Sequence, residues 1–132
     1  MSALACPNHV PPSPAAVAER CYASAYQALA GGDLDNAMRL FGILALMSAK
    51  DERAWIGLAT VCERRENWNV AAGLYGIAGA VAPRSAWCHF GRGRALDRIG
   101  ERALALRELD LAEQATSDNA LLDAIEEERN PS

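Results

Sequence analysis

The sequence predicts an all-α protein in which pairs of helices repeat along the chain and stack into a solenoid. Two observations support this prediction. Small and bulky apolar residues recur in one fixed order through the middle of the chain, from Glu52 to Ser85. In addition, apolar residues make up 51% of the chain but aromatic residues only 6%, so the interior consists mainly of Ala, Leu, Val and Ile. An alanine-rich interior lets helices approach closely, which suits stacked pairs of short helices.

The repeat in the middle of the chain has the order W-x2-L-(G/A), A-x3-(F/Y)-x2-A and a closing Pro. Its defining residues are Trp55, Leu58, Ala59, Ala71, Tyr75, Ala78 and Pro83. This is the pattern of the tetratricopeptide repeat (TPR), a helix–turn–helix unit of about 34 residues. The same frame, moved one repeat back or forward, meets Ala25, Gly32, Ala37 and Phe41, then Gly93, Gly100, Ala105 and Ala112. We therefore predict three tandem repeats and a short C-terminal capping helix.

Start and stop signals predict where each helix lies. Ser13 caps the first helix, Pro14 suits its first turn, and Gly31-Gly32 ends it. Asp33, Asn67 and Asp118 are N-cap candidates further on. The predicted helices cover residues 15–30, 34–47, a third stretch after Asp51 that carries Trp55 to Cys62, 68–81, 85–98, 102–115, and a short acidic stretch that ends before Asn130-Pro131.

These elements predict three parts along the chain. Residues 1–14 contain Pro7, Pro11, Pro12 and Pro14 and are predicted to form a flexible leader. Residues 15–117 form the three-repeat TPR domain, and residues 118–132 form the acidic C-terminal helix and tail.

Composition excludes several function classes. The formal net charge of −4 offers no general attraction for nucleic acid or for anionic lipid. No apolar run is long enough to cross a membrane, so we expect no direct membrane insertion. The first fourteen residues lack the basic and apolar regions of a secretory signal. We expect a cytoplasmic protein.

Residues that bear reactive groups do not form a recognisable catalytic or metal site. Cys6, Cys21, Cys62 and Cys88 include no C-x2-C pair, and His9 and His89 do not complete a ligand set. Because three of the cysteines lie in helical patterns, we expect reduced and mostly buried thiols. The acidic run at residues 126–128 is typical of a solvated helix end. We expect no enzyme, no metal and no cofactor.

The first helix of each TPR pair lines the concave face of the array, so the repeat frame also predicts a binding groove. The candidate groove residues are Tyr22, Tyr26, Leu29, Ile56, Thr60, Glu63, Phe90 and Arg94. Tyr22 and Tyr26 share one helical stripe, which is often plain core, but the frame assigns the core to Ala25 and Ala28 instead. Trp87, and the pair Arg94 and Arg98, fit either a groove lining or a structural role.

The chain resembles the TPR-containing class II chaperones of type III secretion, which guard translocator (pore-forming) subunits in bacteria. The resemblance covers roughly residues 19–116. It rests on Cys21-Tyr22 to Tyr26, on Gly32 to Ala37 with Phe41, on Trp55 to Ala59, and on Trp68, Ala71, Tyr75 and Gly79 to Val81.

The resemblance implies a cytoplasmic bacterial chaperone. Its groove would hold an extended segment of a hydrophobic secreted translocator and keep this client soluble and unassembled before export. Tyr22, Tyr26 and Leu29 would line the client pocket, and Ile56, Thr60 and Phe90 would continue it. A homodimer is compatible with the resemblance, but such chaperones have a longer N-terminal region where this chain has a Pro-rich leader. A general TPR adaptor in another bacterial assembly, or a non-catalytic subunit of an enzyme, are the alternatives.

Overall fold

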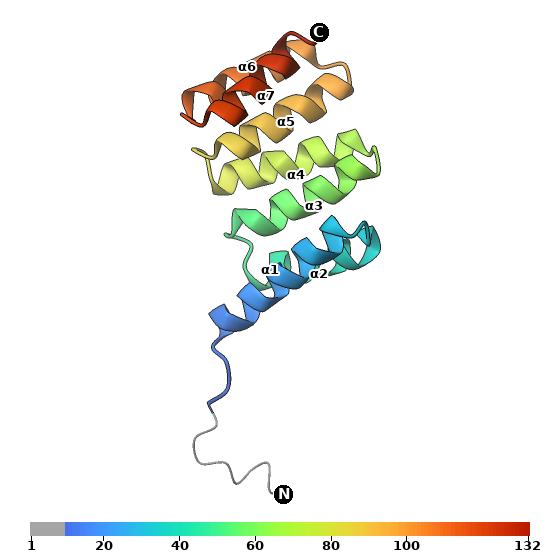
Figure 1. The fold of residues 1–132 in the computed structure, drawn as a ribbon, viewed down its shortest axis with the longest axis vertical. Helices are drawn as coiled ribbons and strands as arrows, with labels where there is room; N and C mark the ends of the chain where they lie inside the picture. The colour runs from blue at the N-terminus through green and yellow to red at the C-terminus, as the bar shows by residue number, and fades with distance from the viewer. Residues whose placement is uncertain (1–9) are drawn as a thin grey trace, which may run out of the picture.

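The computed structural model describes residues 10–132, and within them every regular element is an α-helix (Figure 1). The predicted all-α TPR-type solenoid is therefore confirmed. Most of the predicted leader, with Cys6 and His9, lies outside the described residues. The helices are α1 (Pro14–Ala30), α2 (Leu34–Met47), α3 (Glu52–Arg64), α4 (Trp68–Val81), α5 (Ala86–Arg98), α6 (Arg102–Gln114) and α7 (Asn119–Arg129).

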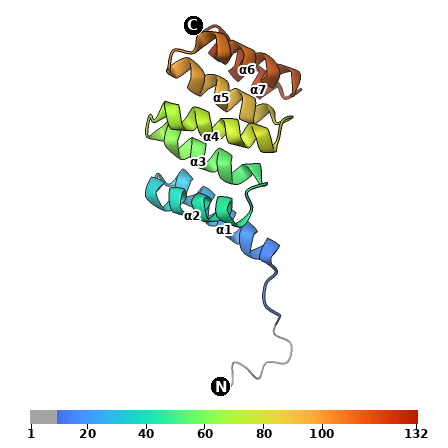
Figure 2. The same ribbon diagram turned by 180° about the vertical axis from the view of Figure 1, so that it is seen from behind.

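The helices pack against their neighbours in chain order, so the molecule is elongated. Helices α1 and α2 lie toward the N-terminal end of the long axis, and α6 and α7 lie at the other end (Figures 1 and 2). Every substantial contact joins two elements that follow each other in the sequence. This nearest-neighbour pattern is typical of repeat proteins, in which each unit contacts only the units beside it.

One type of turn closes α1, α3 and α5. At the same repeat position of each turn a residue has a positive φ angle: 79° at Gly32, 58° at Glu66 and 85° at Gly100. The following backbone N–H then donates to a carbonyl five residues back, at 2.8 to 2.9 Å in all three turns. This is the 6→1 bond of a Schellman motif, which satisfies carbonyls at a helix C-terminus. Glycine fits the left-handed position without strain, whereas Glu66 adopts it at a cost.

The helix boundaries match the sequence prediction closely, with small corrections. Ser85 does not lie within α5 but caps it, its Oγ accepting from Cys88 N–H at 3.4 Å. Asn67 occupies the N-cap position of α4, but its side chain makes no capping bond; its backbone carbonyl accepts from Ala71 N–H instead. Asp33 and Asp118 cap α2 and α7 with their carboxylates as predicted.

The core consists of alanines and a few large side chains at the helix contacts. Ala25, Ala37 and Ala59 are fully buried, as the repeat frame predicts. Between α2 and α3 the buried Phe41 ring packs directly on Gly57, and between α4 and α5 the Tyr75 ring packs on Gly91 in the same way. Each of these glycines provides the space that the aromatic ring of the preceding helix fills.

The thiols of the described residues are unpaired. Cys62 and Cys88 are buried and Cys21 is half-buried. Burial raises the pKa of Cys62 and of Cys88, so both stay protonated at neutral pH. Between residues 10 and 132 no cluster of His, Cys, Asp and Glu is arranged to hold a metal ion. In the same part of the chain, none of the helices has the length and apolar character needed to span a membrane.

Candidate functional site

A cavity of about 400 Å³ opens between α3 and α5 on the face that the repeat frame assigns to the groove. It contains four predicted groove residues, Ile56 and Thr60 from α3 and Phe90 and Arg94 from α5. Thr60 Oγ1 donates to Ile56 O at 2.8 Å, so the hydroxyl is satisfied by the backbone of its own helix. The cavity is lined by Glu52, Arg53, Ile56, Thr60, Tyr75, Ser85, Trp87, Phe90, Gly91 and Arg94.

The wall on the α5 side is aromatic. Trp87 is 57% exposed although it is the largest side chain in the cavity. Its ring meets the Phe90 ring edge-on, with the centroids 6.1 Å apart. Phe90 itself is buried against Leu121 and Ile125 of α7, so it supports the wall from behind. Of the two roles open for Trp87, lining the groove is the one that this exposure favours.

The arginine at the end of the cavity is fixed by an ion pair that crosses from α5 to α3. One guanidinium nitrogen of Arg94 donates to both oxygens of Glu63, at 2.9 and 2.6 Å. Burial opposes its charged form, but the hydrogen bonds and charge of Glu63 outweigh burial and raise the pKa of Arg94. The guanidinium also lies over the Phe90 ring, 5.0 Å from its centroid. Arg94 Nε is buried without a hydrogen-bond partner.

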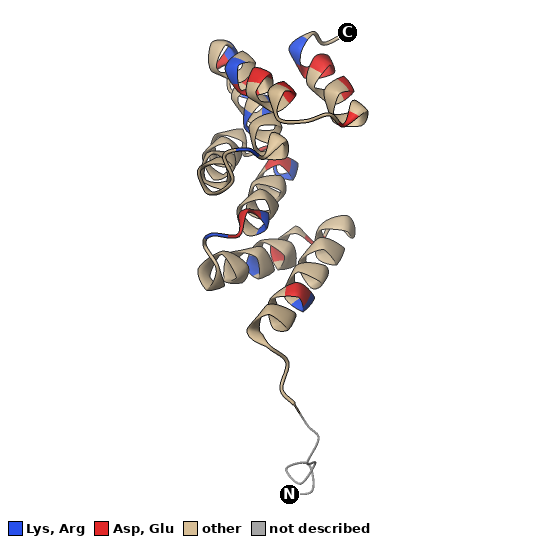
Figure 3. Ribbon diagram, turned by 90° about the vertical axis from the view of Figure 1, so that its left-hand side faces the viewer, with Lys and Arg blue, Asp and Glu red and all other residues tan. Residues whose placement is uncertain are grey.

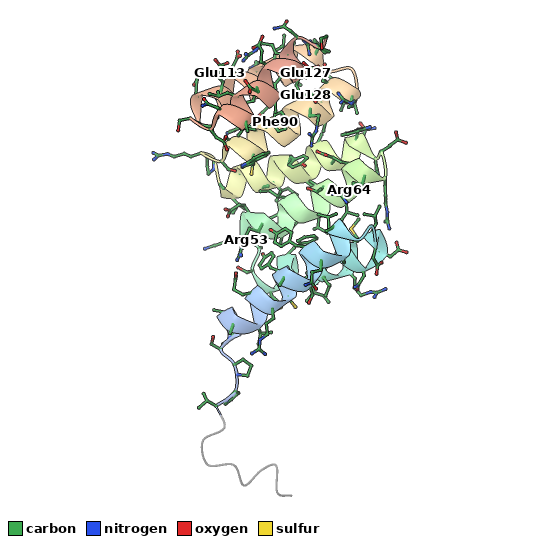
Figure 4. The ribbon with its side chains drawn as sticks, in the orientation of Figure 1. Arg53, Arg64, Phe90, Glu113, Glu127 and Glu128 are labelled. Carbon is green, nitrogen blue, oxygen red and sulfur yellow. The ribbon has the colours of Figure 1, made fainter. Side chains whose placement is uncertain are left out.

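A second arginine, Arg53 at the start of α3, forms the rim of the groove. It bonds Glu19 of α1 at 3.0 and 2.8 Å and Asp51 at 3.1 and 2.8 Å, so two carboxylates surround it. These hydrogen bonds raise the pKa of Arg53 and lower the pKa of both Asp51 and Glu19. Its guanidinium stacks on Tyr22, 4.0 Å from the ring centroid. In Figure 4 the labels of Arg53 and Phe90 mark the α3 and α5 sides of this region.

A separate cavity of about 320 Å³ lies between α1, the end of α2 and the start of α3. Tyr22, Leu44, Met47 and Arg53 are among its lining residues. Arg53 also lines the cavity between α3 and α5, so this single side chain borders both. The polar rim therefore separates two apolar depressions along the inner face.

The first-repeat candidates are placed differently from the others. Tyr22 is only 3% exposed and belongs to the same buried cluster as Ala25 and Ala28, which the sequence alone had set apart from it. The reason is Phe41, whose ring packs against both Tyr22 and Tyr26. Tyr26 remains nearly half exposed, and Leu29 packs partly buried on this cluster. Neither of them lines the cavity between α3 and α5.

Two further arginines of the inner helices, Arg98 and Arg64, contact other helices instead of the cavity. Arg98 lies 3.4 Å from Glu128 of α7 and stacks over the Trp68 ring, outside the α3–α5 cavity. Arg64 donates to Leu29 O at the end of α1 at 2.6 Å. In Figure 4, Arg64 and Glu128 mark these contacts away from Arg53. For Arg98, the structure therefore favours a structural role.

The repeat frame places Arg53 on the inner face, although it is not one of the candidate groove residues named from the sequence. A signal was present, because Glu19 and Arg53 lie 34 residues apart and so occupy the same position in successive repeats. Opposite charges at equivalent positions of adjacent inner helices are neighbours in a stacked array. The Arg94–Glu63 pair, at a separation of 31, does not follow that register and depends on side-chain direction.

Comparison with known proteins identifies the fold but not a sequence family. No protein-family model matches the chain, and no curated protein is similar to it in sequence. The structure of the Yersinia enterocolitica type III secretion chaperone SycD, in complex with a peptide of the translocator YopD, is similar with a TM-score of 0.79 and 20% identity, over 84% of this chain and 88% of that one.

A second SycD structure has a TM-score of 0.81 at 19% identity, over 87% of this chain and 89% of that one. The TPR2B domain of yeast Sti1, in a complex with pHsp70, is equally similar: its TM-score is 0.80 at 17% identity, over 85% of this chain and 92% of that one. The expected resemblance to translocator chaperones is thus confirmed at the level of the fold, which other TPR domains share.

Proposed function

We propose that this protein is a type III secretion chaperone that binds an extended segment of a hydrophobic translocator in its concave groove. The observation that supports the proposal most directly is the combination of a SycD-like fold with an apolar cavity at the predicted groove positions. The client would be held soluble and unassembled in a bacterial cytoplasm until export. Neither a cofactor nor catalysis is part of this proposal, and a homodimer is compatible with it.

The chemistry of the groove suits such a client. A membrane-active protein exposes apolar segments that aggregate, and an apolar cavity covers them reversibly. Trp87 and Ile56 supply the apolar surface, Phe90 supports it from behind, and Arg53 and Arg94 flank it with fixed donors. Because both arginines are already held by carboxylates, the groove needs little reordering when a peptide binds.

Co-expression with a translocator-type protein encoded by a neighbouring gene tests the proposal. We expect the client to become soluble and to co-purify with this chain. In calorimetric titrations with the N-terminal segment of the client, the double variant Tyr26→Ala, Trp87→Ala should bind about tenfold or more weakly, because exposed aromatic anchors carry much of the binding energy in such interfaces.

Val17→Ala is the matched control, since Val17 is an exposed apolar residue of α1 that lines neither of the two cavities and lies outside the groove candidates. It should bind like the wild type. If the double variant binds the client with wild-type affinity, the client does not bind in the groove. A client that stays insoluble in the presence of the wild-type chain would refute the chaperone function itself.

The second candidate is a general TPR adaptor. It is favoured by the equal structural similarity to the Sti1 domain, which is in a complex with pHsp70. In that case the groove variants would lose a short-peptide partner while no translocator is solubilised.

A further inference from the structure

The outer face of the solenoid carries apolar residues that recur at the same repeat positions. Ile43 of α2, Ile77 of α4 and Leu111 of α6 are equivalent, and they are 43%, 43% and 45% exposed. Val70 and Leu104 form a second equivalent pair, at 46% and 43%. Leu46 near the end of α2 is 89% exposed. We call these six residues the outer apolar patch.

Helix α4 is the centre of this patch, and it contains no charged residue over its whole length (Figure 3). A helix that is apolar on all sides is ordinarily buried on all sides. Here the inner side of α4 is covered, with Ala71, Tyr75 and Ala78 buried, while Val70 and Ile77 face outward. Exposed apolar residues that recur in this way on a folded protein favour an interaction site.

The exposed positions of α4 have the spacing and the alternation of a helix-binding seam. Val70, Gly73, Ile77 and Ala80 follow one another at intervals of three, four and three residues, which is the spacing of a and d positions in a coiled coil. Large and small residues alternate along them. A Cβ atom added at Gly73 would meet nothing, so the backbone there is open to close approach by another helix.

The charges around the patch favour one sign of partner. Arg39 of α2 and Arg107 of α6 occupy equivalent repeat positions on either side of α4, and neither forms an ion pair within residues 10–132. The acidic residues of α2 and α6 close to these arginines in the sequence are paired with other residues: Glu108 with His89 and Arg92 at 2.7 Å each, Asp110 with Arg129 at 2.9 Å, and Asp35 with Arg65. A chain with net charge −4 thus presents free arginines at this face.

From this spacing and charge we propose that the outer apolar patch is a second docking surface, and that its occupant is an amphipathic α-helix of another protein whose apolar stripe is bordered by Asp and Glu. The proposal does not depend on the function of the groove, because the patch uses α2, α4 and α6 whereas the groove uses the inner sides of α3 and α5. An anionic membrane is less suited, since the net charge of the chain opposes it and the patch has no aromatic residue.

A pair of synthetic helical peptides tests this proposal. Both are about three heptads long with Leu and Ile at the a and d positions; one carries Glu at the flanking positions and the other carries Lys. We expect the Glu-flanked peptide to shift the amide NMR signals of α2, α4 and α6 saturably, and to bind at least about tenfold more tightly than the Lys-flanked peptide.

Two variants locate the site. Ile77→Glu places a charge in the patch and should weaken binding of the Glu-flanked peptide about tenfold or more. The double charge reversal Arg39→Glu, Arg107→Glu keeps the apolar patch but should exchange the preference toward the Lys-flanked peptide. The groove variant Trp87→Ala should bind like the wild type, and circular dichroism confirms that each variant is folded.

Other outcomes overturn the proposal. Amide NMR shifts confined to α3 and α5 would place the peptide in the groove. Equal affinities for the two peptides would show that the arginines do not select an acidic partner. Sedimentation with phosphatidylserine-containing vesicles that Ile77→Glu abolishes would assign the patch to a membrane. If ultracentrifugation shows a wild-type dimer that Ile77→Glu converts to monomer, the occupant is a second copy of this chain.

Discussion

At the scale of single residues, Tyr22 shows how a predicted groove residue becomes part of the core. The ring is covered by Phe41 on one side and by the Arg53 guanidinium on another. Its hydroxyl is buried and has no hydrogen-bond partner. A buried hydroxyl without a partner loses its hydration and gains nothing in return, which costs about 1–3 kcal/mol.

The variant Tyr22→Phe removes this hydroxyl and keeps the ring. We expect it to raise the free energy of unfolding at neutral pH by about 1 kcal/mol. Urea denaturation measures the effect, and Tyr26→Phe, whose parent ring is nearly half exposed, serves as the control. A loss of stability in Tyr22→Phe would mean that the hydroxyl donates a bond to Asp51 in solution.

The same residue predicts a pH dependence. Burial, followed by the charge of Asp51, raises the pKa of Tyr22 from its ordinary value of 10.0 to about 12. Below pH 10 the hydroxyl is protonated in both the folded and the unfolded state, so this group does not make the free energy of unfolding depend on pH there. Between pH 10 and 12 only the unfolded chain loses this proton, and the free energy of unfolding should fall by about 1.4 kcal/mol per pH unit from this group.

Between pH 10 and 12 the free energy of unfolding should fall less steeply with pH in Tyr22→Phe than in the wild type. It should not become flat, because burial also raises the pKa of Tyr75. Identical alkaline slopes for the variant and the wild type would contradict the assigned pKa of Tyr22.

At the scale of elements, the contact between α2 and α3 rests on the missing side chain of Gly57. A methyl group at this position would overlap the fully buried Phe41 ring, so the ring would have to shift within a close-packed interior. The same arrangement of Gly91 and Tyr75 joins α4 to α5. These two glycines set how closely the helix pairs stack.

We expect Gly57→Ala to lower the free energy of unfolding by about 1–3 kcal/mol, even though alanine favours a helix by about 1 kcal/mol over glycine. Gly42→Ala in α2 is the matched control, because an added methyl group there meets no atom. It should be neutral or stabilise by up to about 1 kcal/mol. Chemical denaturation of both variants measures the difference, and similar stabilities would show that Phe41 moves aside freely.

At the scale of the whole molecule, the two ends of the solenoid are capped in different ways. At the N-terminal end the positions equivalent to the fully buried Ala54 and Val61 hold Arg20 and Gln27, which are exposed. Polar residues there suit a face that no other helix of residues 10–132 covers. At the other end α7 buries Leu121 and Ile125, and Arg129 joins it to Asp110 and Glu113 of α6.

This arrangement predicts a gradient of local stability. Because α3, α4 and α5 are packed on both sides along the stack, we expect their amides to exchange most slowly with solvent. The first turn of α1 and the whole of α7 should exchange faster. Hydrogen exchange followed by mass spectrometry measures this, and protection of α7 equal to that of α4 would indicate a single cooperative unit.

The fold could be predicted from the sequence alone, because each TPR position requires a residue of a certain size or backbone conformation within one repeat. Gly32 and Gly100 mark left-handed turn positions, and small residues such as Ala59 and Ala71 mark the helix contacts. The third turn shows the limit, since Glu66 occupies the left-handed position without any signal in its side chain. For the candidate site, the frame predicted the inner helices and four residues of the cavity between α3 and α5.

Only the tertiary structure decides whether an inward side chain is buried, paired or exposed, because its neighbours come from helices a repeat away in the sequence. The Phe41 ring buries Tyr22, which periodicity assigns to the groove. Arg94 turns to Glu63 and Trp87 stays exposed, choices of side-chain direction that helical spacing does not encode. Repeat spacing thus determines which face a residue occupies, whereas packing and ion pairing between stacked helices determine whether it is buried, paired or free to bind.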